Sequence, residues 1–327
     1  MYVHKCTNRK RASIPSLFSS FFIWEKCSEQ RVTCIKMEKV DEYLNASKLQ
    51  YHDTSEIVEE FDKELREMHG RCIDLGCGPG QVTVELILPR LPRESVIIGV
   101  DVSNAMLEHA TKNYRENPRL SFLHLDIETS NLPQEQIARY DNAVSFYCLH
   151  WCHNTRSFAY VLRLAFENIF KLLRPGGKAL IMFLAYNDGF DAYVRIHENP
   201  RYQPYMQDAH KFVPYFHRSN DSRGALRSIL EDIGFNVLHC SKREKSFVYQ
   251  NIQSLKKHAL AVNPFISRIP EGDLKEEFED ILIREIISRK ILFPNKADKC
   301  QQEYSVLDRY HILVTYMEKP YTNVTTK

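Results

Sequence analysis

The stretch FYCLHWCHN at 146–154 gathers two cysteines and two histidines around a tryptophan, residue types that first suggest a metal site. Zinc requires four ligands that converge at about 2.0–2.3 Å. On a continuing strand that rises about 3.3 Å per residue, Cys148 and Cys152 would lie about 13 Å apart, too far for one ion. The sequence offers no second cysteine–histidine pair at metal-ligand spacing. We therefore predict no metal, assign both cysteines to buried packing, and retain Trp151, whose indole offers one N–H donor and a large apolar face.

A glycine-rich turn lies upstream, in the stretch CIDLGCGPGQVTVEL. Gly76, Gly78 and Gly80 follow an apolar run and precede a helical pattern, with Cys77 among them. Glycine allows positive φ and a close approach of the backbone to a ligand. The dinucleotide pattern G-x-G-x-x-G would need glycine at position 81, where this chain has Gln81. The form D-x-G-x-G-x-G is instead typical of turns that bind S-adenosylmethionine (AdoMet), which has no pyrophosphate.

Acidic residues follow the next two apolar runs. Asp101, with Val102 beside it, can accept hydrogen bonds from both hydroxyls of a ribose. Asp126 can accept from an adenine amino group while Ile127 packs on the ring. Either aspartate alone would be an ordinary helix cap or loop residue. A glycine turn and two acids at three successive strand ends favour a nucleoside site, and Ser145, near the end of the fourth run, then falls beside the methionine portion of AdoMet.

The elements between these residues alternate short β-rich apolar runs with helical stretches, which is typical of a parallel sheet covered on both faces. We predict strands at 71–75, 96–101, 120–125, 141–147, 178–184, 236–249 and 311–319. We predict helices near 81–89, 103–115, 132–138 and 156–173, the last ended by Pro-Gly-Gly at 175–177. The expected fold is α/β, with a Rossmann-like, seven-stranded, mostly parallel sheet between helices and a helical lid inserted before the last strand.

The domain boundaries follow from these patterns. We expect an AdoMet-binding domain with an N-terminal helix at 37–250, a helical lid at 251–300, and the last strand and tail at 301–327. Residues 1–36 are basic and contain SLFSSFFIW, which is similar to a weak targeting segment. Met37 opens a helix-like stretch and is a second candidate for the start codon. We favour this second interpretation, in which 1–36 is an extension that is disordered or not translated.

The composition limits the partners and the compartment. Lys and Arg total 44 and Asp and Glu total 42 among 327 residues, so charge predicts neither a nucleic-acid partner nor an anionic membrane surface. The nine cysteines have no regular spacing, which favours reduced thiols in a cytoplasmic protein. The apolar run near the N-terminus spans only about nine residues, too short to cross a bilayer. The expected partner is a small molecule.

Taken together, residues 70–319 resemble the Rossmann-like AdoMet-dependent methyltransferases, in which the acid at the position of Asp74 orients the glycine loop and the methionine amino group. From Met37 onward the chain also resembles the insect juvenile hormone acid O-methyltransferases. The stretches that carry this second resemblance are NASKLQYHD (45–53), IDLGCGPG, LDIE, FYCLHW, YQPYMQDAHKFVPYFHRSNDS (202–222) and NIQSLKKHALAVNPFISRIP (251–270). The resemblance implies that Gln50 and Trp151 tether a substrate carboxylate. From the residues alone, Gln50 would be a solvated helix residue.

The activity that this resemblance implies is conversion of juvenile hormone acid or farnesoic acid to its methyl ester. A carboxylic acid, with a pKa near about 4–4.5, is already ionised at neutral pH, so the reaction needs no general base. Charge disappears as the carboxylate displaces the sulfonium, so a dry pocket favours the reaction. Aromatic residues of the segment after Tyr186 either supply an apolar wall for an isoprenoid tail or fill the core of the lid. They are Tyr193, Tyr202, Tyr205, Phe212, Tyr215 and Phe216.

Two other functions fit the same motifs. One is a methyltransferase of the trans-aconitate type, whose polar polycarboxylate substrate would need several cationic groups around Trp151. The other is a regulatory protein that binds AdoMet without transferring its methyl group. The presence of both Gln50 and Trp151 argues against the second.

Overall fold

The computed structural model describes residues 40–152, 158–294 and 304–321. The expectations for residues 1–36, and the part of FYCLHWCHN that begins at His153, lie outside these ranges. All described residues belong to one compact unit, Thr33–Lys327. No helix in the described part of the chain is long and apolar enough to span a membrane.

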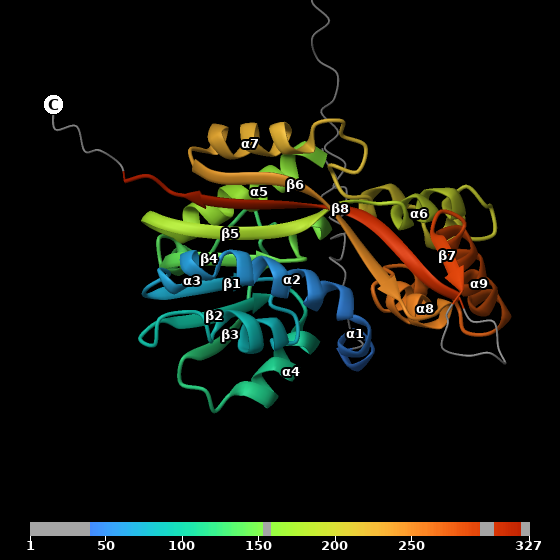
Figure 1. The fold of residues 1–327 in the computed structure, drawn as a ribbon, viewed down its shortest axis with the longest axis horizontal. Helices are drawn as coiled ribbons and strands as arrows, with labels where there is room; N and C mark the ends of the chain where they lie inside the picture. The colour runs from blue at the N-terminus through green and yellow to red at the C-terminus, as the bar shows by residue number, and fades with distance from the viewer. Residues whose placement is uncertain (1–39, 153–157, 295–303, 322–327) are drawn as a thin grey trace, which may run out of the picture. The chain divides into compact units, whose positions relative to one another are not determined.

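An eight-stranded sheet lies at the centre of the described chain (Figure 1). The strands are β1 (Arg71–Leu75), β2 (Val96–Asp101), β3 (Leu120–His124), β4 (Tyr140–Phe146), β5 (Leu173–Asn187), β6 (Asn236–Tyr249), β7 (Ile291–Pro294) and β8 (Tyr304–Glu318). Their order is β3-β2-β1-β4-β5-β8-β6, with β7 paired to β8. The first five are parallel, and β8 runs antiparallel to β5, β6 and β7. The predicted α/β fold is confirmed; the short β7, which lies where only helices were expected, is the added strand.

Helices and helical turns connect the strands. The α-helices are α1 (Val40–Ala46), α2 (Lys48–Glu60), α3 (Asp62–Arg66), α4 (Asn104–Tyr114), α5 (Phe158–Leu172), α6 (Gly189–His197), α7 (Ser222–Ile233), α8 (Ile252–Ala261) and α9 (Asp273–Ile287). A π-helical turn, η1, spans Thr83–Ile87. The 3-10 turns are η2 (Gln134–Gln136), η3 (Leu149–Trp151), η4 (Gln203–Tyr205), η5 (Ala209–Phe212) and η6 (Ile266–Arg268).

Both faces of the central strands are buried, which explains why their sequences are largely apolar. Successive residues of a strand point to opposite faces. Cys72 and Val144 accordingly belong to a core cluster that includes residues of α2, α6, α8 and α9. Ile73 and Ala143 belong to a second cluster that includes residues of α5 and α7. The sheet is therefore a rigid platform between two apolar layers.

Two predicted elements differ from the structure. The helix expected near 132–138 is only the 3-10 turn η2, which begins directly after Pro133. The Pro-Gly-Gly at 175–177 does not follow α5 as a separate stop, because α5 ends at Leu172 and β5 begins at once. Gly176 has a φ of +79°, and its N–H donates to the carbonyl of Lys319 at 2.7 Å. Glycine thus lets the chain turn while it is already paired with the sheet.

The long strands β6 and β8 carry the helices α6, α8 and α9 at one end, together with β7 (Figure 1). Of the six aromatic residues predicted here as a pocket wall or as core, four are buried, Tyr205 is partly buried, and Tyr215 is exposed. Several pack ring to ring inside the core: Tyr202 against Phe278 at 5.5 Å, Phe212 against Phe265 at 5.1 Å, and Phe216 against Phe183 at 6.2 Å. Core packing is therefore the main role of this set.

Candidate active site

The glycine turn follows β1 directly and is held against the end of β2. The N–H groups of Gly76 and Cys77 both donate to the carbonyl of Val100, at 2.8 and 3.0 Å. A Cβ on Gly76 would lie 2.3 Å from the Sγ of Cys148, so a side chain has no room there. Gly78, with a φ of +53°, has no atom within 4 Å of where its Cβ would be. The turn is thus packed on one side and open at Gly78, as close approach by a ligand requires.

Two carboxylates lie beneath this turn. Asp74 is buried and accepts a hydrogen bond from the Thr83 hydroxyl at 2.5 Å, where the π-helical turn η1 begins. Burial, and then the charge of Asp101, raise the pKa of Asp74 to about 7. Asp101 accepts from the N–H of Gly78 at 2.9 Å and from that of Ser103 at 2.8 Å. Burial raises the pKa of Asp101 despite these hydrogen bonds.

Two cavities open beside the turn at the carboxyl ends of the parallel strands. The first, which we call the loop cavity, is lined by Asp74, Gly76, Cys77 and Gly78, together with Gln50 and Tyr147. The second, the acid cavity, is lined by Asp101, Val102, Asp126 and Ile127, together with Gly76 and Trp151. The structure therefore brings most of the predicted cofactor residues together around Gly76.

Two of the predicted cofactor residues, Gly80 and Ser145, do not line the loop or acid cavity. A Cβ on Gly80 would lie 3.2 Å from side-chain atoms of Ala110, Tyr114 and Phe122, so this glycine lets α4 and β3 pack closely. Ser145 is fully buried, and its hydroxyl donates to the carbonyl of Leu75 at 2.8 Å. This bond joins β4 to β1, and the structure does not place the Ser145 hydroxyl in the loop or acid cavity.

A larger cavity adjoins both, and we call it the large cavity. Gln50 and Tyr147 line it as well as the loop cavity, and Trp151 lines it as well as the acid cavity. Its apolar wall consists of Leu49, Leu184, Phe190, Tyr193, Leu255 and Ile286. The two residues predicted to tether a carboxylate, which lie 101 positions apart in the printed sequence, thus meet at one cavity.

Gln50 and Trp151 reach this cavity from different elements. Gln50 lies near the start of α2, and its Oε1 is buried without a hydrogen-bond partner among the described residues. The separation expected for Cys148 and Cys152 assumed that the strand continues through Trp151. Instead β4 ends at Phe146, and the 3-10 turn η3 follows it at Leu149–Trp151. The Trp151 ring packs at 4.8 Å from His150 and 5.9 Å from Phe190. The turn directs the indole toward the cavity rather than along the sheet edge.

Three residues that sequence reasoning missed lie at the same place. Asp53 on α2 is fully buried and accepts hydrogen bonds from the hydroxyls of Tyr147 and Tyr310. Tyr147 and Asp53 belong to the stretches FYCLHW and NASKLQYHD, and Asp53 follows Gln50 by three positions, which is one helical turn. This spacing on a predicted helix could have placed Asp53 on the same face as Gln50 from sequence alone. Tyr310 had no such signal, because it is one of many apolar or aromatic residues in β8.

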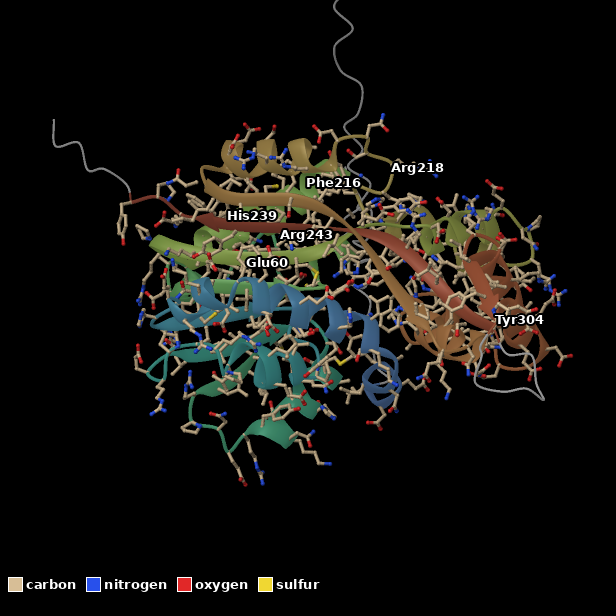
Figure 2. The ribbon with its side chains drawn as sticks, viewed as in Figure 1. Glu60, Phe216, Arg218, His239, Arg243 and Tyr304 are labelled. Carbon is tan, nitrogen blue, oxygen red and sulfur yellow. The ribbon has the colours of Figure 1, made fainter. Side chains whose placement is uncertain are left out.

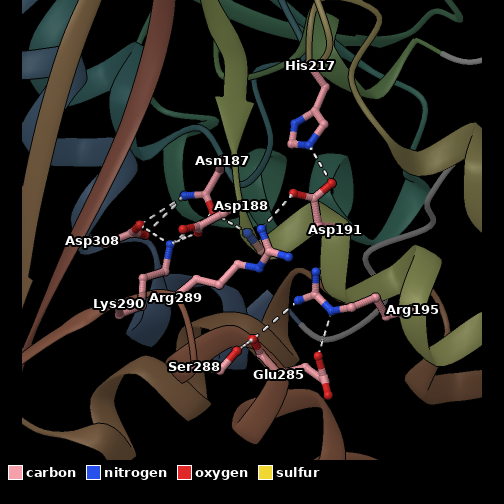
Figure 3. A network of polar contacts seen from close by, with 11 residues as sticks. Asn187, Asp188, Asp191, Arg195, His217, Glu285, Ser288, Arg289, Lys290 and Asp308 are labelled. Atoms are coloured by element: carbon pink, nitrogen blue, oxygen red, sulfur yellow. Dashed lines mark hydrogen bonds and ion pairs between the residues drawn. The ribbon is translucent and has the colours of Figure 1, made fainter.

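A buried ion network closes one side of the large cavity (Figure 3). Lys290 forms ion pairs with Asp188 and Asp308, and Asn187 donates to both oxygens of Asp308 at 3.3 and 3.1 Å. The Lys290 side chain is only 1% exposed, so its charge is compensated entirely within the protein. This network joins β8 to the end of β5 and the segment after α9.

Comparisons with known proteins agree with this site. The family described as "Methyltransferase domain" matches residues 72–177, so the fold and the cavities around Gly76 define an AdoMet-dependent methyltransferase. "Juvenile hormone acid O-methyltransferase" of Drosophila melanogaster is 32% identical over 287 residues, covering 86% of this chain and 93% of the relative. The Bombyx mori protein of the same name is 28% identical over 286 residues, covering 86% and 98%. The chain belongs to the juvenile hormone acid O-methyltransferase family, as its motifs suggested.

A third relative matches over a shorter length. "Trans-aconitate 2-methyltransferase" of Methylobacterium radiotolerans is 38% identical over 105 residues, but these cover only 32% of this chain and 34% of the relative.

The residues around the glycine turn fit AdoMet. The molecule carries a sulfonium and an ammonium cation, together with the hydroxyls and amino group of adenosine. Among the described residues, the loop and acid cavities present carboxylates of Asp74, Asp101 and Asp126 and no lysine or arginine. Acidic groups stabilise cations and accept hydrogen bonds from hydroxyl and amino groups, but they repel a pyrophosphate. The open face at Gly78 gives the ligand room beside the backbone.

Proposed function

We propose that this methyltransferase converts an isoprenoid monocarboxylic acid, such as juvenile hormone acid or farnesoic acid, to its methyl ester. The observation that carries the proposal is the lining of the large cavity. Gln50 and Trp151 are placed at its border with the loop and acid cavities, and the remaining wall is largely apolar. Among the described residues, no lysine or arginine lines it.

This lining favours an anion with one charge and a long apolar body. A polycarboxylate such as trans-aconitate carries additional charges, and burying each one without a cation is costly. On the side of the large cavity that Asp308 lines, the cation of Lys290 is already shared by the carboxylates of Asp188 and Asp308, so it is not available to a second anionic group. The names of the two full-length insect relatives agree with a single-carboxylate substrate.

We assign roles in binding and orientation to Gln50, to Trp151 and to the apolar wall of the large cavity. The substrate carboxylate is ionised at neutral pH, so no protein group has to remove a proton. When bound, AdoMet supplies an electrophilic methyl carbon on its sulfonium, and this carbon passes from sulfur to a carboxylate oxygen. Neutral donors such as Gln50 and Trp151 can aim the carboxylate without neutralising it. Orientation of two reactants can contribute about 7–11 kcal/mol to the barrier reduction, and the apolar wall excludes water.

A labelled-methyl assay tests this proposal. The full-length enzyme is incubated with methyl-labelled AdoMet and, separately, farnesoic acid, juvenile hormone acid, a saturated fatty acid and trans-aconitate. We expect label in the isoprenoid acids and little in trans-aconitate. Preferential labelling of trans-aconitate would contradict the assignment of the large cavity. Binding of AdoMet by calorimetry without label in any acid would contradict the proposed carboxyl-methylation activity.

A further inference from the structure

A buried carboxylate, that of Asp53, lies behind Tyr147, which lines both the loop cavity and the large cavity. The Oδ2 atom of Asp53 accepts a hydrogen bond from the Tyr147 hydroxyl at 2.5 Å and another from the Tyr310 hydroxyl at 2.8 Å. Both tyrosines line the large cavity, and Tyr147 also lines the loop cavity. A single carboxylate oxygen therefore joins α2 to the end of β4 and to β8.

Tyr147 has a backbone conformation that needs such support. Its φ is +54°, in the left-handed region, which is strained for a residue other than glycine and persists only where the surroundings hold it. Its N–H donates to the carbonyl of Met182 at 3.0 Å, and its hydroxyl is held by Asp53. Burial and the charge of Asp53 raise the pKa of both Tyr147 and Tyr310. Both hydroxyls therefore remain protonated donors at neutral pH.

The helix that carries Asp53 also carries Gln50. The two residues are three positions apart on α2 and so lie on one face of it. Farther along α2, Arg243 of β6 donates to the Glu60 carboxylate at 2.8 Å (Figure 2). This second attachment fixes the far end of the helix and does not line the three cavities described above. Nearer Gln50, α2 is also attached through the Tyr51 hydroxyl, which donates to Glu85 at 3.0 Å, and through the ion pair of Glu56 with Lys245. The Asp53 contacts differ from these because they reach residues that line the large cavity.

We propose that Asp53 is a positioning residue for methyl transfer, which through Tyr147 and Tyr310 fixes the Gln50 face of α2 against the border of the loop and large cavities. Asp53 itself has no exposed surface and does not line the large cavity, so it acts through the tyrosines and the helix. The inference rests on the proposed function, because it assumes that Gln50 orients the substrate carboxylate.

Two substitutions separate positioning from charge. Asp53→Leu keeps the approximate size of the side chain and removes the acceptor. Asp53→Asn removes the charge, and with it the ion pair of Oδ1 with Lys245 at 3.6 Å and the contact of Oδ1 with His52 at 3.4 Å. It keeps one carbonyl oxygen, which can replace Oδ2 because both hydroxyls donate to that single atom. We expect Asp53→Leu to lower kcat by about 10- to 100-fold, as misplacement of a reacting group does, with little change in AdoMet affinity. Asp53→Asn should restore kcat to within about threefold of the wild type.

Glu60→Gln is the matched control on the same helix. It weakens the attachment to Arg243, so we expect a lower unfolding temperature with kcat unchanged. The amount of folded protein in each variant is measured by S-adenosylhomocysteine titration, and kcat is expressed per binding site. A purely structural role for Asp53 would lower the number of sites and leave kcat per site intact. Equal kcat values per site in Asp53→Leu, Asp53→Asn and wild type would overturn the proposal.

The labelled-methyl assay with the four acids tests the proposed function separately from the role of Asp53. If the wild type methylates an isoprenoid acid, the proposed function holds, and the kcat values of the Asp53 variants then support or refute the positioning role. If the wild type methylates no acid, the proposed function fails, and hydrogen exchange over residues 48–53 decides instead. Faster exchange in Asp53→Leu than in Asp53→Asn would then support the attachment, and identical exchange would refute it.

Discussion

At the residue scale, Trp151 is the side chain on which the proposed chemistry depends most directly. It lines both the acid cavity and the large cavity, so its ring lies between the space assigned to the cofactor and the space assigned to the substrate. A tyrosine or phenylalanine there would supply a similar apolar surface, but only the indole combines a rigid ring with an N–H donor. The ring and the donor can therefore be separated by substitution.

Trp151→Phe keeps the aromatic surface and removes the N–H group. We expect kcat for the isoprenoid acid to fall by about 10- to 100-fold, because a lost hydrogen bond to a charged group such as a carboxylate costs about 1.5–3 kcal/mol. The affinity for AdoMet should change less than threefold, as measured by calorimetry. Unchanged turnover would mean that the indole is only a wall of the cavity.

At the element scale, some features could be predicted from sequence and others could not. The strands β1 and β2 were predicted at their observed bounds, because short apolar runs between glycine and polar breaks leave few alternatives. The start of β5 was missed because Pro175 and Gly176 are ordinary stop signals, and only the pairing with the chain near Lys319 makes them part of the sheet. Long-range pairing is not encoded in local pattern.

The same limit applies to the site. The residues that meet around Gly76 were predicted because strand order alone brings the ends of parallel strands to one edge. Asp53, Tyr147 and Tyr310 were missed because their hydrogen bonds join residues 94 and 257 positions apart. For Ser145, the position near the end of β4 could be predicted from the apolar run, but the face to which its hydroxyl points could not.

Also at this scale, Lys290 is an interior cation that joins elements around the large cavity. Lys290→Met preserves the apolar stem and leaves the partly buried carboxylate of Asp188 and the buried carboxylate of Asp308 without their cation. Breaking a buried ion pair costs about 3–5 kcal/mol, and we expect a loss of this size in the free energy of unfolding from urea titration. The half-buried Lys256, which pairs with Glu279 and Asp280, provides the control: Lys256→Met should cost less than about 1 kcal/mol. Similar losses in both variants would contradict this assignment.

At the scale of the whole molecule, the site is divided between two parts of the described chain. The loop and acid cavities are formed largely at the ends of β1, β2, β3 and β4. The large cavity is completed by α6, α8 and α9, whose sequences lie between β5 and β8. Helix α2 borders both parts through Gln50.

The stability of the whole fold should depend on the protonation of Asp74 beneath that turn. Its pKa is about 7 in the folded protein and 3.8 without the fold's influence, so between these values the folded state holds a proton that the unfolded chain has lost. Stability from this group is complete below pH 3.8 and is lost as the pH rises through 7. For the free enzyme we expect Asp74→Asn to reduce the decline in unfolding free energy between pH 5 and 8 by about 3 kcal/mol. Urea titrations of both proteins at these pH values measure the difference, and parallel declines would show that Asp74 is already ionised at pH 5.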